Sequence, residues 1–217
     1  MDPDVLFRIV DVTGVICNGL LGAAVARKHG FDIIGFLVLG TCTALGGGLF
    51  RDMMLGTGFP VALTDPWYLG GAFTASAIAY FIPLESKWWQ RGLALGDVLA
   101  LGCWSATGAS KAISAGLGIV PAIFLGVVTA CCGGIIRDIM VNRIPAIFGG
   151  HPLYATFSVI AATQMAFLQL AGYYEIGMGS AIISCAILGL AARKYRWILP
   201  KPYNLTNFKS RGKHQKD

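Results

Sequence analysis

A glycine cluster followed by an arginine–aspartate pair occurs twice in the chain, and these residues are costly to place where they stand. The two copies comprise Gly46, Gly47, Gly48, Arg51 and Asp52, then Gly133, Gly134, Arg137 and Asp138. Each copy closes a long apolar run, where an interior glycine costs about 1 kcal/mol relative to alanine. A charge at membrane depth costs at least ~2.5 kcal/mol. Because both costs recur together, we expect the glycines to bend or unwind a helix for a functional purpose.

An unwound helix at membrane depth would give the glycine clusters a direct chemical role. Such backbone is tolerated only where it is buried in protein or lines water. Its freed carbonyl oxygens carry partial negative charge and suit a cation. The alternative is a tight helix crossing, which small residues also permit. The charged pairs directly behind the glycines favour a bend beside a permeation path.

Each arginine–aspartate pair has two possible roles, which the sequence leaves open. The pairs could line the two mouths of a pathway and set its charge preference. They could instead cap a half-helix and fix the bend, and one carboxylate could do both. The sequence therefore predicts a structural role, a pore role, or both for Arg51, Asp52, Arg137 and Asp138.

Further charged and hydroxyl side chains lie inside the apolar runs. Lys111 could extend to the outer interface, as lysines near helix ends do, or enter the path, repel cations and respond to voltage. Hydroxyl groups nearby would bond between helices by default, or face the path; they belong to Thr107, Ser110 and Thr129. Asp11 and Asp97 stand early in their runs, either as functional carboxylates or at the interface.

The composition is that of a membrane protein. Of 217 residues 55% are hydrophobic and only 13% charged, with a mean hydropathy of +0.65, whereas a soluble domain carries about 25% charged residues. Most of the net charge of +6 lies near the C-terminus, where a basic segment predicts a cytoplasmic anchor against anionic lipid rather than nucleic-acid binding. The sequence contains no enzyme motif, phosphate loop or metal-ligand spacing, so we expect no catalysis, cofactor or metal.

Seven membrane-spanning helices are predicted from the apolar runs. They cover residues 5–27, 31–49, 66–84, 93–114, 118–136, 152–171 and 176–197. Lysine and arginine follow the odd-numbered spans, which predicts an N-terminus outside and a C-terminus in the cytoplasm. We expect one transmembrane domain over residues 1–199 and a basic cytoplasmic tail over 200–217.

The chain contains an internal repeat with an offset of 86 residues. The offset pairs Asp11 with Asp97, Gly22 with Gly108, Thr43 with Thr129, Gly47 with Gly133, Arg51 with Arg137 and Asp52 with Asp138. The repeats cover about 5–84 and 93–171, and 176–197 is an unpaired extra helix. Three spans per repeat make the second copy inverted, an arrangement that places a functional path at the repeat interface.

These residues resemble the prokaryotic branch of the trimeric intracellular cation (TRIC) channel family. The doubled Gly-Gly-x-x-Arg-Asp motif carries the resemblance, which covers residues 5–197. It implies a homotrimer with one water-filled pore per protomer, passing potassium and other monovalent cations between kinked second and fifth helices. It assigns the hinges to the two glycine clusters, and Lys111 looks like the fourth-helix lysine linked to voltage gating in animal members.

Two other functions remain open on the sequence. A small-substrate secondary transporter, for example of glycine, would use the same inverted repeats for alternating access. A structural module with a packed core would need no path at all. For the channel we expect a location in a bacterial-type inner membrane, with monovalent cations, membrane lipid and further copies of the chain as partners.

Overall fold

The computed structural model describes residues 3–83, 86–148, 154–195 and 197, and the regular secondary structure of this part of the chain is helical. The predicted tail over 200–217 lies outside the described residues. The helices are α1 (Pro3–Lys28), α2 (Ile33–Leu55), α3 (Val61–Thr64), α4 (Pro66–Phe81), α5 (Lys87–Ser114), α6 (Ile119–Met140), the 3₁₀ helix η1 (Ala146–Phe148), α7 (Tyr154–Leu170) and α8 (Tyr174–Tyr195).

Local sequence signals explain where the helices begin and end. The Asp32 side chain accepts a hydrogen bond from the backbone N–H of Gly35 at 2.8 Å and caps α2, as short polar residues do at helix starts. Asp65 caps α4 in the same way, directly before Pro66. α2 ends at Gly56, whose φ of 61° is a left-handed conformation that glycine adopts without strain.

Five of the helices are long and apolar enough to cross a membrane: α1, α2, α5, α6 and α8. α7 is an apolar helix of 17 residues and α4 has 16, so each rises only about 24–26 Å at 1.5 Å per residue. The described segments thus include five helices of full spanning length and two shorter ones where seven spans are predicted.

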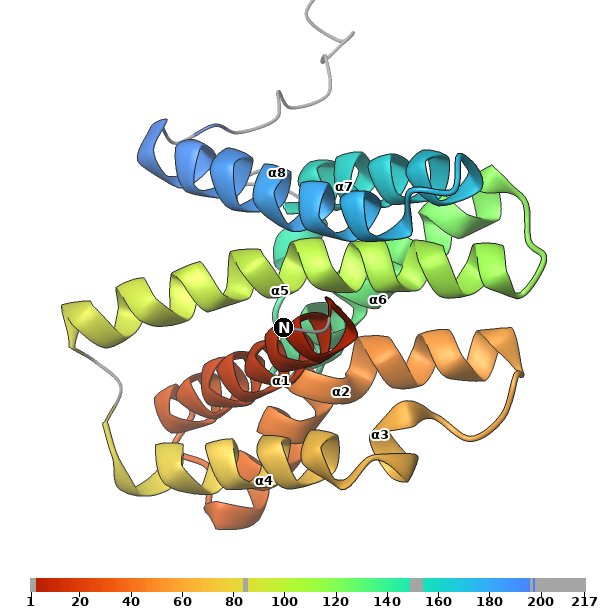
Figure 1. Ribbon diagram of the computed structural model, residues 1–217. Helices are drawn as coiled ribbons and strands as arrows, with labels where there is room; N and C mark the ends of the chain where they lie inside the picture. Colours follow the sequence, from red (N-terminus) through yellow and green to blue (C-terminus); the bar gives the residue numbers. More distant parts are fainter. Residues whose placement is uncertain (1–2, 84–85, 149–153, 196, 198–217) are drawn as a thin grey trace, which may run out of the picture.

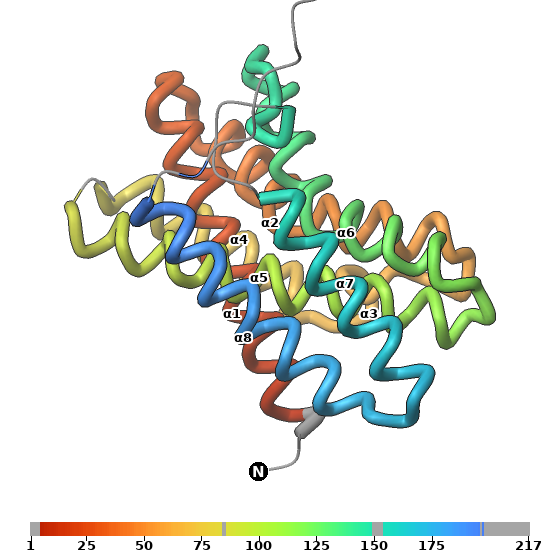
Figure 2. Tube along the Cα trace, turned by 90° about the horizontal axis from the view of Figure 1, so that it is seen from above, coloured from red at the N-terminus to blue at the C-terminus, as the bar shows by residue number. Residues whose placement is uncertain are grey.

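The helices form two groups that meet along α1, α2, α5 and α6. α1 packs on α2 and α4, and α5 packs on α6 and α7. α2 contacts α6 and α1 contacts α5 across the boundary, while α8 covers α5 and α7 (Figure 1). Figure 2 shows α2 in orange and α6 in green running side by side at the centre of the contact.

The glycine clusters lie inside continuous helices. Of the two expectations for them, a bend or an unwound turn, the unwound turn is therefore wrong. α2 and α6 keep their helical assignment through the glycines and extend to Leu55 and Met140. The predicted ends at 49 and 136 are therefore too early, and both arginine–aspartate pairs lie within helices. A Cβ on Gly47 would overlap the carbonyl oxygen of Thr129, and one on Gly133 would overlap that of Thr43. Because glycine has no side chain, the two backbones can touch at these positions. This is the tight helix crossing that the sequence offered as the alternative.

Positions 86 residues apart have matching surroundings. A Cβ on Gly22 would lie 2.5 Å from the hydroxyl oxygen of Thr43 and 2.8 Å from the Cα of Gly40. The corresponding distances for Gly108 are 2.5 Å to Thr129 and 2.8 Å to Gly126. The contacts that join the first two helices of each group therefore obey the sequence repeat.

The α2–α6 contact yields the first prediction. Gly47→Ala places a methyl group against the rigid carbonyl of Thr129, so we expect a loss of about 1–3 kcal/mol, the usual cost of overpacking. Gly70→Ala, in α4 with nothing within 4 Å of the added Cβ, should leave stability unchanged or raise it by up to ~1 kcal/mol. Thermal unfolding of both variants in detergent, followed by size-exclusion chromatography, measures the difference. Equal melting temperatures for the two variants would contradict the contact.

Candidate functional site

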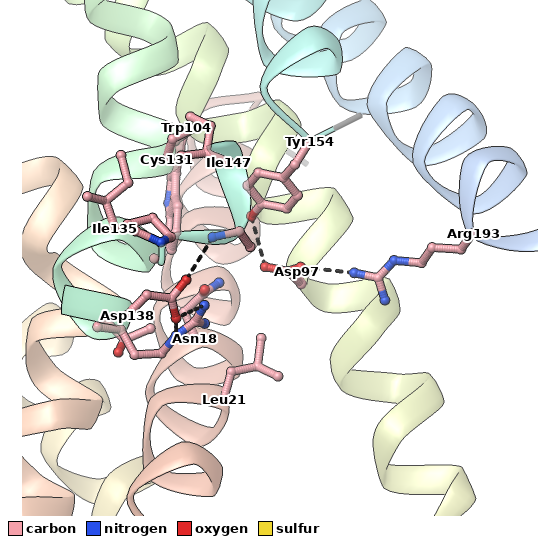
Figure 3. Close-up of a pocket in the computed structure, with 16 residues that line it drawn as sticks. Asn18, Leu21, Asp97, Trp104, Cys131, Ile135, Asp138, Ile147, Tyr154 and Arg193 are labelled. Atoms are coloured by element: carbon pink, nitrogen blue, oxygen red, sulfur yellow. Dashed lines mark hydrogen bonds and ion pairs between the residues drawn. The ribbon is translucent and has the colours of Figure 1, made fainter. Parts of the chain in front are cut away.

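The larger of two cavities at the α2–α6 contact lies on the side of the second repeat and is called the second-half cavity. Its volume is about 440 Å³. It is lined by Asn18, Leu21, Thr43, Asp97, Trp104, Ala130, Cys131, Gly134, Ile135, Arg137, Asp138, Pro145, Ala146, Ile147, Tyr154 and Arg193. Figure 3 shows that its acidic and basic side chains come from different helices and converge on one space.

The smaller cavity, called the first-half cavity, has a volume of about 30 Å³. It is lined by Asp11, Val15, Ala44, Leu45, Gly48, Arg51, Asp52, Val61, Ala62, Tyr68, Trp104 and Thr129. Nearly every lining residue has its repeat equivalent in the larger cavity. The two are therefore corresponding sites of the two halves, and they differ in volume.

In each half the aspartate of the Arg–Asp pair makes the same two interactions. Asp52 Oδ1 accepts from Arg51 Nε at 2.7 Å, and its Oδ2 accepts from the Val61 backbone N–H at 3.0 Å. Asp138 accepts from Arg137 Nε at 2.8 Å and from the Ala146 backbone N–H at 3.1 Å. Each carboxylate thus caps the short helix that follows, α3 or η1, while lining its cavity. The same carboxylates therefore hold a short helix in place and line a cavity.

Lys111 distinguishes the two halves. Its Nζ lies 3.1 Å from Oδ1 of Asp52, so the lysine side chain, 35% exposed, pairs with a carboxylate that is 8% exposed. The repeat equivalent of Lys111 is Val25, and Asp138 has no lysine at the corresponding place. Lys111 therefore neither extends alone to the interface nor stands free in the larger cavity; it adds a second cation to the first-half carboxylate.

The aspartates that stand early in α1 and α5, Asp11 and Asp97, each pair with a tyrosine. Tyr68 donates to Asp11 at 2.6 Å, and Tyr154 donates to Asp97 at 2.9 Å. The residues of both pairs are 57 positions apart. The 86-residue offset also relates Tyr68 to Tyr154, so the repeat contained the signal that could have identified them.

The second oxygen of each of these aspartates has a different partner. Asp11 Oδ1 accepts from the indole Nε1 of Trp104 at 2.6 Å. Asp97 Oδ2 pairs at 3.0 Å with Arg193 in the last turn of α8 (Figure 3). The repeat could not have indicated either partner, because Trp104 corresponds to Asn18 and Arg193 has no equivalent.

A protein-family model matches the chain in two parts, which correspond to the two repeats. The family model described as "Glycine transporter" matches residues 8–83 and again residues 94–169, two segments that begin 86 residues apart. Together they cover more than half of the chain. The chain belongs to the glycine transporter family.

Relatives in this family are membrane proteins. A UPF0126 membrane protein of Deinococcus radiodurans is 35% identical over 70% of this chain and 72% of its own length. The UPF0126 inner membrane protein YadS of Escherichia coli is 31% identical over 89% of this chain and 93% of its own length. With the five apolar helices, these relatives identify an integral membrane protein.

Solved structures confirm the resemblance to TRIC channels. A TRIC cation channel studied for its conductance has a TM-score of 0.84 at 31% identity, covering 91% of this chain and 98% of its own. The TRIC trimeric intracellular cation channel orthologue from Rhodobacter sphaeroides has a TM-score of 0.80 at 28% identity, covering 88% and 99%. This member of the glycine transporter family therefore has the TRIC channel fold, and these similar proteins are channels and membrane proteins rather than enzymes.

The structure separates the predicted site residues of this family member into three groups. One group lines the cavities: Gly48, Arg51, Asp52, Asp11 and Thr129 on the first-half side, and Gly134, Arg137, Asp138 and Asp97 on the other. A second group, Gly46, Gly47 and Gly133, forms the helix contact, where a Cβ would meet the opposite helix. The third group, Thr107, Ser110 and Lys111, lines neither cavity.

Thr107 and Ser110 of the third group both take part in hydrogen bonds within or between helices. Thr107 donates to the Cys103 carbonyl of its own helix at 2.8 Å, and the Ser110 carbonyl accepts from Gln169 of α7 at 3.3 Å. Within the described ranges no group of three or more histidine, cysteine or acidic side chains could hold a metal ion.

The tyrosine–aspartate pairs yield the second prediction. Tyr68→Phe removes one of the two donors to the half-buried Asp11 carboxylate, so we expect a loss of roughly 1.5–3 kcal/mol, the range for hydrogen bonds to charged groups. Tyr80→Phe, on the same helix α4, touches neither aspartate and serves as the control. Thermal unfolding in detergent measures both. If Tyr68→Phe has the same melting temperature as the parent protein, the bond between Tyr68 and Asp11 contributes nothing to stability.

Lys111 yields the third prediction. Removing its charge in Lys111→Met should destabilise the protein less than Asp52→Asn, because Asp52 also holds Arg51 and caps α3. In a double-mutant cycle the coupling between positions 52 and 111 should be about 0.2–1 kcal/mol, as for partly exposed ion pairs. A cycle with Arg8 and Asp65, an ion pair outside both cavities, provides the comparison. A coupling of zero would show that the lysine does not hold Asp52.

Proposed function

We propose that the protein is a monovalent cation channel, chiefly for potassium, with one path through each protomer. The observation that supports it best is the pair of equivalent cavities at the α2–α6 contact. Trp104 lines both cavities, so the proposed path would have its constriction at this residue. The path would run from one cavity past this constriction to the other, between α2 and α6 bent at their glycines.

The charges in the cavities suit weak binding of a monovalent ion. In the second-half cavity Asp97 is paired with Arg193 and Asp138 with Arg137. A divalent ion favours several carboxylate oxygens at once, and here each carboxylate already has a cationic partner. Carboxylate, hydroxyl and carbonyl oxygens remain for brief contacts, and conduction requires that an ion can leave as easily as it enters.

The membrane topology that fits this path is the inverted repeat. We infer seven spans, α1, α2, α4, α5, α6, α7 and α8, in one domain over residues 1–199, with three-helix repeats of opposite orientation and α8 as the extra helix. The N-terminus would lie outside and the tail over 200–217 in the cytoplasm of a bacterial inner membrane. The matching glycine contacts of the two halves support the repeat.

A homotrimer surrounded by lipid completes the proposal. The Rhodobacter sphaeroides structure is of a trimeric channel and covers 88% of this chain. Large apolar side chains are exposed on the outer helices, among them Ile183 and Ile187 on α8. Exposed apolar faces of this kind fit contact with lipid or with neighbouring protomers.

A carrier for glycine is the second candidate. The name of the matching family supports it, as does the inequality of the two cavities, about 440 Å³ against about 30 Å³. Inverted repeats that open one side while the other closes are the basis of alternating access. A substrate with one ammonium and one carboxylate could use the paired charges of the open cavity.

The fourth prediction tests both functions. Purified protein in liposomes should carry a potassium current that grows with the membrane potential. Asp138→Asn should lower it by roughly tenfold if the carboxylate lowers the barrier by about 1.4 kcal/mol. Asp65→Asn, which removes a carboxylate outside both cavities, is the control. Absence of current together with saturable glycine uptake would replace the channel by the carrier.

A further inference from the structure

The two cavities differ in size although they are built from equivalent positions. Their volumes are about 440 Å³ and about 30 Å³. The glycines, arginines, aspartates and tyrosines are the same residue types on both sides, so they do not account for the difference. The equivalent pair that differs most in side-chain bulk is Trp104 and Asn18.

Trp104 fills space on the side of the first-half cavity. Its indole Nε1 donates to Asp11 at 2.6 Å, and the residue is 8% exposed. A Cβ on Gly14 would lie 3.3 Å from its ring atom Cζ2, so α1 has a glycine where the ring passes. Tyr68 occupies the other oxygen of Asp11, and the carboxylate therefore has two donors that hold it beside the ring.

Asn18 leaves the corresponding space open in the other half. Its Nδ2 donates to the carbonyl of Gly14 on its own helix at 3.2 Å, and it is 6% exposed. Asp97, the equivalent of Asp11, receives no indole; its second oxygen pairs with Arg193 at 3.0 Å. The short amide side chain thus lines the cavity without crossing it.

We propose that Trp104 is the plug of the path: its indole closes the first-half cavity and separates it from the second-half cavity, which Asn18 leaves open. Movement of the ring out of this space would join the two cavities. The consequence for ion flux rests on the proposed channel function. The consequence for cavity access does not, because it concerns only which space a small reagent can enter.

Two equivalent alanines report on access to the two cavities. Ala44 lines the first-half cavity and Ala130 the second-half cavity, and they are 5% and 4% exposed. Each is replaced by cysteine in turn, and its modification by a small cationic methanethiosulfonate reagent is followed by mass spectrometry of the peptide concerned. In the parent background we expect Ala130→Cys to be modified faster than Ala44→Cys.

Exchanging the residues at positions 104 and 18 should change which of the two cavities a reagent can enter. Trp104→Asn should raise the modification rate at position 44 by at least ~tenfold, as expected when a shielding contact of about 1.4 kcal/mol is removed. Asn18→Trp should lower the rate at position 130, because the indole then enters the open cavity. The double variant should reverse the order of the two rates. Potassium flux should rise in Trp104→Asn and fall in Asn18→Trp.

Two controls separate bulk from other effects. Trp104→Phe keeps a planar ring and loses the donor to Asp11, so position 44 should stay protected. Trp88→Asn removes an exposed indole from the same helix α5 and should change neither rate. Fast modification at position 44 in Trp104→Phe would overturn the plug.

The outcomes distinguish the plug from the channel. Unchanged modification at 44 in a folded Trp104→Asn overturns the plug, whatever the flux. If Trp104→Asn does not fold, an unchanged rate at 130 in Asn18→Trp overturns it. The expected modification pattern without potassium flux in any variant supports the plug and rejects the channel. Flux in the parent with unchanged modification in both variants rejects the plug and leaves the channel.

Discussion

Direct contact between the backbones of α2 and α6 is the constraint on which the rest of the structure depends. Gly47 faces the carbonyl of Thr129, and Gly133 faces that of Thr43. Only residues without a Cβ allow this approach, and close packing is what holds helices together where lipid removes the hydrophobic drive. The contact places one Arg–Asp pair and one cavity beside each helix, so it determines where any path can run.

The two threonines at this contact keep their hydroxyls within their own helices. Thr43 donates to the Leu39 carbonyl and Thr129 to the Leu125 carbonyl, each at 2.6 Å. Such bonds to the residue four positions earlier often bend a helix. Such a bend leaves every turn helical, so it is compatible with the continuous α2 and α6.

The two halves share one set of aspartate interactions, and each half has further contacts that the other lacks. Both contain an aspartate bonded to an arginine and a short helix, and a second aspartate bonded to a tyrosine. The carboxylates of the first half also bond to Lys111 and Trp104 of α5, while Asp97 of the second half pairs with Arg193 of α8. The repeated interactions therefore lie beside two equivalent cavities, and the added partners are the polar contacts in which the two differ.

The sequence by itself determined the helical membrane fold, the 86-residue repeat and the doubled glycine and Arg–Asp motifs, because apolar length and costly residues in one register are visible along a single chain. It also singled out Asp11 and Asp97 as carboxylates that are either functional or interfacial, but not their partners. Tertiary structure alone decided that the glycines mark a helix contact rather than unwound backbone, since a Cβ can clash only with a neighbour. It likewise decided the pairing of Lys111, Trp104 and Arg193 with particular aspartates, because those residues break the repeat and only packing brings them together.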